Sequence, residues 1–148
     1  MVKEIKYKDT GVDTQQEEQC MQSVKRWVKD TFKFSTHSRV CLDVGYFANV
    51  IDIGQGIGVA IGTDGVGTKI LIAEMLERYD TVGIDCIAMN VNDVICVGAR
   101  PISMVDYVAV QKIRPNFIDE LGIGLKEGAR QSCISIPGGE IAQVREMI

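Results

Sequence analysis

The chain has 148 residues, of which 46% are hydrophobic and 24% are charged, and its formal net charge is −4. This length supplies enough apolar material for one hydrophobic core and is short for two, so we expect a single domain over residues 1–148. Nucleic acids and anionic membranes bind cationic surfaces, and the acidic balance therefore argues against both as the main partner.

The N-terminal part of the sequence predicts a helix followed by a β-hairpin. Residues 14–32 repeat apolar side chains on one helical face, as expected of an amphipathic surface helix. Residues 46–53 and 58–63 are extended segments on either side of the glycine-rich GQGIG, and this arrangement favours an antiparallel hairpin. The second strand leads directly into the loop GTDGVGTK at residues 62–69.

The rest of the chain alternates helices with strands. Helical patterns cover residues 69–79 and 81–98, and the apolar, β-branched stretch 101–110 is typical of a buried strand. A further helix over 115–132 begins with a proline, and residues 133–139 are expected to form a strand that ends in a diglycine turn. This order predicts an α/β or α+β fold in which helices cover a sheet.

Cysteine and histidine usage indicates neither a disulfide framework nor a zinc site. The five cysteines are scattered without C-x-x-C spacing and are predicted to be buried free thiols. The single histidine, His37, lies in the polar stretch STHSR, which is typical of a surface residue rather than a catalytic base. Without an apolar run of membrane-spanning length or a signal-peptide core, the chain is expected to be cytoplasmic.

The loop GTDGVGTK resembles a phosphate-binding P-loop but differs from it in two features. A P-loop places a lysine directly after its second glycine and a hydroxyl residue after the lysine. Here Thr68 precedes Lys69, and Asp64 lies inside the loop. The Asp64 carboxylate would repel a phosphate unless a metal ion stood between them. An ordinary Asp-Gly turn is the alternative explanation of Asp64 and Gly65.

The helix over residues 81–98 has one face suited to core packing and a second face without long charged side chains. The expected core stripe consists of Ile84, Ile87, Ala88, Val91, Val94, Ile95 and Gly98. The other face carries Asp85, Met89, Asn92, Asp93 and Cys96, and residues 81–99 contain no Lys, Arg or Glu. We therefore expect another subunit, another domain or a ligand to cover this second face.

Several aspartates are candidate metal ligands. Asp85 and Asp93 have no obvious local partner, and a buried, unpaired carboxylate is costly unless a cation neutralises it. Magnesium takes one or two carboxylates together with phosphate oxygens, and Asp64, Asp93 and Asp106 would supply the carboxylates. Lys69 would add local positive charge. The alternatives are a helix-dipole role for Asp85 and a backbone hydrogen bond for Asp106.

Beyond these patterns, several runs of the sequence resemble one known family. YKDTGVD, GTDGVGTK, YDTVGIDCIAMNVNDVICVGARP, VDYVAV and PGGE are similar to the N-terminal half of the aminoimidazole ribonucleotide synthetases, the phosphoribosylformylglycinamidine cyclo-ligases of purine biosynthesis. The matches extend from Tyr7 to Glu140. The wider superfamily includes selenophosphate synthetase and thiamine monophosphate kinase, and its members use ATP.

The resemblance implies a helix-layered, mostly antiparallel sheet in an N-terminal ATP-binding domain. It also implies a homodimer formed through this sheet, with ATP near the subunit interface. In the implied reaction the formyl oxygen of the substrate attacks the γ-phosphate of ATP, and an amine then closes the ring as phosphate leaves. Such a reaction needs positioning and charge neutralisation more than a strong base, which agrees with a chain that has one histidine.

Carried over residue by residue, the resemblance implies a nucleotide set and a metal set. The ATP-binding residues would be Asp64, Gly65, Gly67, Thr68, Lys69, Gly138, Gly139 and Glu140. The Mg²⁺ ligands would be Asp64 and Asp93, to which the sequence pattern adds Asp106. The resemblance assigns no residue to catalysis itself.

Three features depart from the family pattern. CLDVGYFANV stands where bacterial members have a glycine-rich loop, and Ile141 stands where a threonine commonly follows GGE. Family members also carry a C-terminal domain, absent from this chain, that completes the active site. We therefore expect an N-terminal part that is inactive in isolation. A noncatalytic nucleotide-binding or dimerisation module, and a related kinase such as thiamine monophosphate kinase, are the alternatives.

Overall fold

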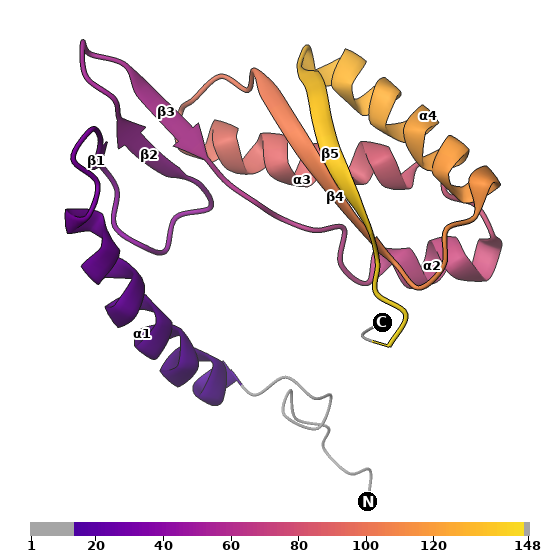
Figure 1. The fold of residues 1–148 in the computed structure, drawn as a ribbon, viewed down its shortest axis with the longest axis horizontal. Helices are drawn as coiled ribbons and strands as arrows, with labels where there is room; N and C mark the ends of the chain where they lie inside the picture. Colours follow the sequence, from indigo (N-terminus) through magenta and orange to yellow (C-terminus); the bar gives the residue numbers. More distant parts are fainter. Residues whose placement is uncertain (1–13, 147–148) are drawn as a thin grey trace, which may run out of the picture.

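The computed structural model describes residues 14–146, so the N-terminal match at residues 7–13 lies outside it. The predicted order of helices and strands is confirmed, with the short strand β1 in addition (Figure 1). The elements are α1 (Thr14–Asp30), the 3-10 helix η2 (Thr31–Lys33), β1 (Arg39–Val40), β2 (Asn49–Asp52), β3 (Gly58–Ile61), α2 (Lys69–Leu76), α3 (Val82–Cys96), β4 (Ser103–Val110), α4 (Pro115–Ser132) and β5 (Ser135–Gln143).

Residues 14–61 form a part that we call the hairpin unit, with α1, η2 and the antiparallel sheet β1-β2-β3 (Figure 1). The predicted hairpin is confirmed, with Asn49 opposite Ile61. Its glycine-rich turn closes through the Ile57 N–H, which donates to the Gly54 carbonyl at 3.0 Å. Gly54 has a φ of 91°, a left-handed conformation that favours glycine.

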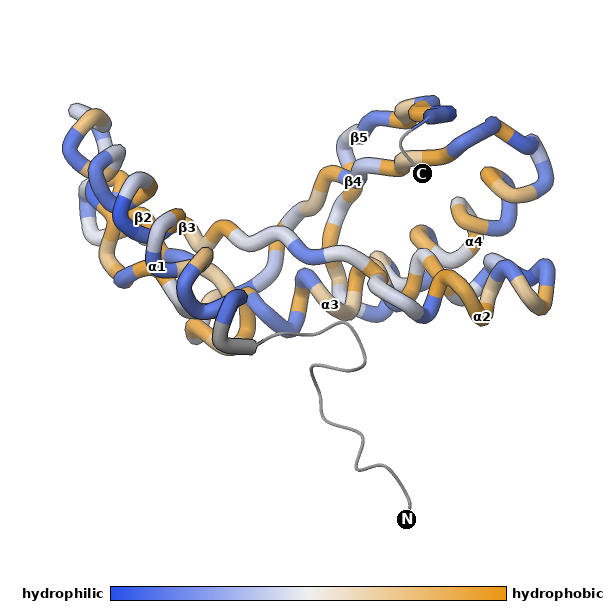
Figure 2. Tube along the Cα trace, turned by 90° about the horizontal axis from the view of Figure 1, so that it is seen from below, coloured by the Kyte–Doolittle hydropathy of each residue, from blue (hydrophilic) through white to orange (hydrophobic). Residues whose placement is uncertain are grey.

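Residues 62–146 form a second part, the helix–sheet layer, in which β4 and β5 pair in parallel. Parallel neighbours need a crossover connection, and α4 provides it. Figure 2 shows α3 and α4 on one side of β4 and β5. The mixed α/β class is confirmed, but the expected single, mostly antiparallel sheet is wrong, because the antiparallel strands and the parallel pair form separate sheets.

The contact between α3 and α4 depends on glycines at the point where the helices come closest. A Cβ added to Gly124 would lie 2.6 Å from the Asp80 carbonyl oxygen and 3.1 Å from the Gly83 Cα. A Cβ added to Gly128 would lie 3.0 Å from the end of the Ile87 side chain. Ile87 is only 1% exposed, because the close approach of the two helix backbones excludes water from this part of the core.

A hydrophobic cluster joins α2, α3 and α4 behind the parallel sheet. It consists of Ala73, Tyr79, Val82 and Leu121. The Tyr79 ring packs edge-on against Phe117 with centroids 4.8 Å apart, and its hydroxyl accepts a hydrogen bond from Arg114. The predicted core stripe of α3 is wrong at Ile95, which is 54% exposed at the end of the helix, and at Gly98, which is exposed beyond it.

Element ends differ from the sequence prediction where the backbone turns left-handed. The helix predicted to continue to residue 98 ends at Cys96, because Gly98 has a φ of 76° and its N–H donates to the Ile95 carbonyl. The helix predicted over 69–79 ends at Leu76, where Glu77 takes a φ of 48°. The turn predicted at Gly138 and Gly139 is also wrong, since β5 continues through these glycines to Gln143.

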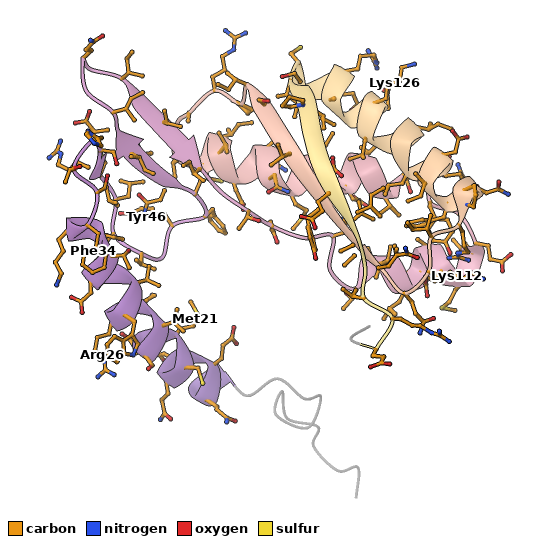
Figure 3. All side chains as sticks on the ribbon, viewed as in Figure 1. Met21, Arg26, Phe34, Tyr46, Lys112 and Lys126 are labelled. Carbon is orange, nitrogen blue, oxygen red and sulfur yellow. The ribbon has the colours of Figure 1, made fainter. Side chains whose placement is uncertain are left out.

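Solvent exposure tests the predictions for the histidine and the cysteines. His37 is exposed, as expected, but Cys20, Cys41, Cys96 and Cys133 are exposed as well, so the prediction of buried thiols is wrong for them. Figure 3 shows Arg26 on the side of α1 that points away from the helix–sheet layer and Met21 on the opposite side of the helix. Within residues 14–146, none of the helices has the length and hydropathy that crossing a bilayer would require.

Candidate functional site

The loop of residues 62–68 joins β3 to α2 and is tied to α3 at both ends. At its start, the Asp64 N–H donates to Asn90 Oδ1 at 2.9 Å, and Asn90 Nδ2 donates to the Asp64 carbonyl at 3.1 Å. At its end, Lys69 Nζ lies 2.8 Å from Asp85 Oδ1. The loop therefore runs beside the first two-thirds of α3, in the opposite direction to the helix.

The local sequence of the loop sets its turn into α2. Asp64 Oδ1 accepts a hydrogen bond from the Gly65 N–H at 2.7 Å, so the Asp-Gly turn expected as an alternative is present. Gly67 has a φ of 70° and permits the bend before the helix. Thr68 occupies the N-cap position of α2 without a side-chain capping bond. Asp64, Gly67 and Thr68 are all exposed and are therefore accessible from solvent.

Asp85 is not the unpaired carboxylate that the sequence suggested. Its ion pair with Lys69 supplies the partner, because α2 begins beside the first turn of α3. Both side chains keep about half of their exposure, 51% for Lys69 and 41% for Asp85, so water still reaches the pair. The Lys69 ammonium is consequently held at the end of the loop rather than being free to point elsewhere.

Asp93 lies on the same face of α3 as the residue that holds Asp64. Cys86, Asn90 and Asp93 follow one another at helical spacings of four and three residues, which places them in one row. Asn90 bonds to the backbone of Asp64, so Asp93 is about one helical turn from that contact. Asp93 is half-buried, as are Asp85 and Met89 on the uncharged side of the helix.

Asp106 approaches the same region from the sheet. It alternates with exposed neighbours along β4 and faces the helices. Burial raises the pKa of the Cys86 thiol, and the negative charges of Asp106 and Asp64 raise it further, so both carboxylates lie within electrostatic reach of Cys86. A cavity of about 190 Å³ between the sheet and the helices is lined by Val66, Cys86 and Asp106, among others.

Of the two glycines in the diglycine segment, only Gly139 lies on the side of the sheet that carries Asp106. Gly139 is opposite Asp106 in the parallel register, and a Cβ added there would lie 2.6 Å from Asp106 Cγ. Only glycine leaves room for the carboxylate. Gly138 and Glu140 alternate to the outer face of β5, where Glu140 is opposite the exposed Tyr107.

The described residues do not form a complete metal cage by themselves. Within residues 14–146, no three His, Cys, Asp or Glu side chains gather in a group that could hold a metal ion. Magnesium normally takes only one or two carboxylates and completes its shell with water and substrate phosphates. Asp64 is exposed and Asp93 is half-buried, and both are carboxylates of the kind that this donor set uses.

The space beside the loop is large enough for a small ligand. A cleft of about 680 Å³ lies between β3, α3 and the segment before β4, and its lining includes Thr63, Asn90 and Arg100. Ligand pockets commonly occupy about 300–1,000 Å³. Sequence reasoning missed Asn90. Its only signal was an asparagine in a helix interior, where that residue is neutral to unfavourable unless its side chain bonds elsewhere.

The family comparison covers the whole of this site. The family described as AIR synthase related protein, N-terminal domain, matches residues 45–148. The chain belongs to this family. The matched residues include the hairpin β2–β3, the loop, α3 and both strands of the parallel sheet, whereas α1 lies before them. The AIR synthase-related region thus contains the loop with Asp64, the helix with Asp93 and the strand with Asp106.

The sequence similarity to named relatives covers nearly the whole chain. A phosphoribosylformylglycinamidine cyclo-ligase from Methanothermobacter thermautotrophicus is 46% identical over 144 residues, which are 97% of this chain and 41% of that protein. Proteins of the same name from Methanococcoides burtonii and Thermococcus kodakarensis are 43% and 42% identical, each over 146 residues. The chain spans about two-fifths of the length of these relatives.

Proposed function

We propose that the chain is the N-terminal, ATP-binding part of a phosphoribosylformylglycinamidine cyclo-ligase. The observation that carries the proposal is the double attachment of loop 62–68 to α3, which holds the exposed Asp64 and Lys69 along the helix that carries Asp93. The names of the relatives favour the cyclo-ligase over a superfamily kinase. The whole reaction would convert formylglycinamidine ribonucleotide to aminoimidazole ribonucleotide, with ADP and phosphate as the other products.

The site residues suit phosphoryl transfer by charge neutralisation. Mg²⁺ bound with ATP would lower the negative charge on the phosphates and so assist attack by the substrate oxygen. Asp64 and Asp93 would hold that ion, and Asp106 would add negative charge from the sheet side. Lys69 Nζ would bind a phosphate oxygen from the end of the loop, and the exposed backbone of Gly65, Gly67 and Thr68 would line the same path.

The proposal includes a homodimer formed through the outer face of the parallel sheet. Val105 and Tyr107 on β4 are 69% and 64% exposed and lie on the same face of the two-stranded parallel sheet. Exposed apolar side chains grouped on one face mark interaction sites. Gly138 and Glu140 lie on this same face, so a partner subunit would bring them towards its own ligand. We place the protein in the cytoplasm, and its free thiols support a reducing compartment.

The experiment uses the protein as its full reading frame encodes it, assayed with ATP, Mg²⁺ and formylglycinamidine ribonucleotide for release of ADP and aminoimidazole ribonucleotide. We expect turnover by the wild type and a loss of kcat/KM on the order of 100-fold in Asp93→Asn, because one metal ligand loses its charge. Asp119→Asn, which changes an exposed carboxylate on α4, is the matched control and is expected to remain active.

Two outcomes would contradict this assignment. ADP release with thiamine monophosphate and none with formylglycinamidine ribonucleotide would replace the cyclo-ligase with a kinase. Unchanged turnover and unchanged magnesium-dependent ATP binding in a folded Asp93→Asn variant would remove that residue from the site.

A further inference from the structure

Asn90 makes three hydrogen bonds that link α3 to the loop carrying Asp64. Its Oδ1 accepts from the Asp64 N–H at 2.9 Å, and its Nδ2 donates to the Asp64 carbonyl at 3.1 Å. The same Nδ2 donates to the Cys86 carbonyl one turn earlier on α3 at 2.9 Å. One side chain therefore binds both polar groups of a single backbone residue that is 26 positions away in the sequence.

We propose that Asn90 is the positioning residue that fixes Asp64 for metal binding in the proposed nucleotide site. The proposal rests on the proposed function, because it assumes that Asp64 is a Mg²⁺ ligand. Asn90 itself touches neither metal nor nucleotide in this account. It acts through the backbone of Asp64, because it bonds to both the N–H and the carbonyl of that residue. This restraint on the backbone limits the directions in which the Asp64 carboxylate can point.

The chemistry of the contact is specific to asparagine. The Asp64 backbone offers one donor and one acceptor, and a carboxamide presents an acceptor and a donor at matching separation. Only one orientation of the amide satisfies all three bonds, since a flipped amide would set its oxygen against two carbonyl oxygens. Aspartate has the same size but lacks the donor, and leucine has a similar volume with neither group. Glutamine is one methylene longer and overshoots the loop.

The other contact between the loop and α3, the Lys69–Asp85 ion pair, is five residues after Asp64 and does not hold Asp64 itself. The Asp64 side chain is exposed, and Oδ1 accepts a local bond from the Gly65 N–H. That bond orients the carboxylate relative to its own loop and leaves the loop free to move relative to α3. The Asn90 contact holds Asp64 itself against α3, and Asn90 is about one helical turn from Asp93, the second proposed ligand. Groups that orient metal ligands commonly change metal affinity by about 10–100-fold when they are removed.

A matched control exists in the other half of the molecule. Asn49 Nδ2 donates to the Leu42 carbonyl at 3.1 Å and so also ties two backbone segments together, within the hairpin unit, where Asn49 lies opposite Ile61 rather than Asp64. Its loss would weaken the fold through a side-chain-to-backbone bond of the same kind. A purely structural role for Asn90 predicts that the two asparagines behave alike.

The test measures ATP binding by calorimetry in the full-length protein over a series of Mg²⁺ concentrations, alongside the thermal midpoint of each variant. We expect Asn90→Leu and Asn90→Asp to raise the Mg²⁺ concentration needed for half-maximal ATP binding by about tenfold or more. Asn49→Ala is expected to lower the thermal midpoint and leave the Mg²⁺ requirement at the wild-type value. The Asn90→Asp variant keeps the size of the side chain and guards against a general packing defect.

The outcomes separate the inference from the proposed function. If wild-type protein binds ATP with a Mg²⁺ requirement and both Asn90 variants keep that requirement, Asn90 is structural and the inference is wrong. A shift of equal size in Asn49→Ala would overturn it too, because the effect would then follow stability. If the wild type shows no magnesium-dependent ATP binding, the proposed function fails and the inference fails with it.

Discussion

The hairpin unit and the helix–sheet layer differ in where their apolar side chains lie. Of the six buried hydrophobic residues among those the structure describes, Ala48 alone belongs to the hairpin unit, and Ala73, Tyr79, Val82, Ile87 and Leu121 belong to the layer. In the hairpin unit Trp27, Phe34 and Phe47 are 65%, 69% and 73% exposed, and Phe34 is visible at the end of α1 in Figure 3.

This difference indicates that the two parts depend on different sources of stability. The layer buries its own cluster between helices and sheet, and it holds the loop and the aspartates of the proposed site. The hairpin unit has regular backbone pairing but little burial of its own, and exposed apolar groups of this kind mark interaction surfaces. We therefore expect the layer to determine global stability and the hairpin unit to respond mainly to association.

The largest contrast should come from truncating one apolar side chain in each part. Leu121→Ala removes a side chain that is 8% exposed and is expected to cost about 2–5 kcal/mol of unfolding free energy. Trp27→Ala removes a larger side chain that is mostly exposed, and the expected change is within about 0.5 kcal/mol. Urea denaturation followed by far-UV circular dichroism measures both. Comparable costs would mean that α1 is packed more deeply than its exposure indicates.

A second, smaller contrast lies within α4. Gly124→Ala would place a methyl group 2.6 Å from the Asp80 carbonyl oxygen, and we expect a loss of about 1–3 kcal/mol because backbone atoms cannot easily move aside. Gly122→Ala meets nothing within 4 Å, and the higher helix propensity of alanine is expected to add about 0.5–1 kcal/mol. Denaturant midpoints of the two variants should therefore move in opposite directions. A stabilising Gly124→Ala would contradict the close α3–α4 approach.

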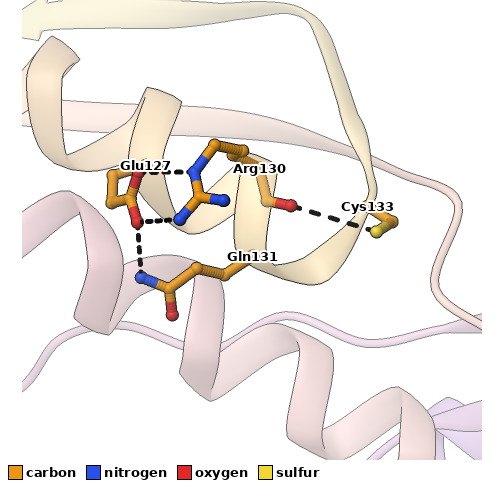
Figure 4. Close-up of polar contacts among 4 residues, drawn as sticks. All are labelled: Glu127, Arg130, Gln131 and Cys133. Carbon is orange, nitrogen blue, oxygen red and sulfur yellow. Dashed lines mark hydrogen bonds and ion pairs between the residues drawn. The ribbon is translucent and has the colours of Figure 1, made fainter.

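The smallest effect concerns pH and the end of α4. Glu127 accepts hydrogen bonds from Arg130 and Gln131, which lower the pKa of its carboxyl to about 2 from an ordinary value of 4.5 (Figure 4). In the unfolded chain the group is protonated below about 4.5, so its contribution to stability is complete above that pH and is lost as pH falls towards 2.

Denaturation of the wild type and of Glu127→Gln at about pH 6 and about pH 3 measures this contribution. We expect the difference in stability between the two proteins to narrow at the lower pH. A constant difference would mean that the bidentate contact between Arg130 and Glu127 does not persist in solution.

The sequence predicted most elements of the fold because their signals are local. Pro115 marked the start of α4, and GQGIG marked the hairpin turn, since each residue type restricts its own backbone. The separation into two sheets could not be predicted in this way. Whether β4 pairs with β5 or with the hairpin depends on contacts between distant segments. The residue pattern of a strand does not identify the strand with which it pairs.

The sequence predicted which residues could belong to the candidate site, but it did not predict which of them contact one another. Asp64, Asp93 and Lys69 were recognisable from their loop and helix patterns, but the ion pair between Lys69 and Asp85 joins elements whose relative placement the sequence does not give. Asn90 was missed for the same reason. That Gly139 lies beside Asp106 became apparent only from the strand register, which pairs these two residues.

The central claim, that the nucleotide binds along the loop and α3 in the helix–sheet layer, is tested most directly by hydrogen exchange with and without ATP and Mg²⁺. We predict slower amide exchange in residues 62–69 and 82–93 when both are present, and unchanged exchange in those segments with ATP alone. Exchange in residues 39–61 should change less. Protection confined to the hairpin unit, or protection of the loop that is independent of Mg²⁺, would contradict the account.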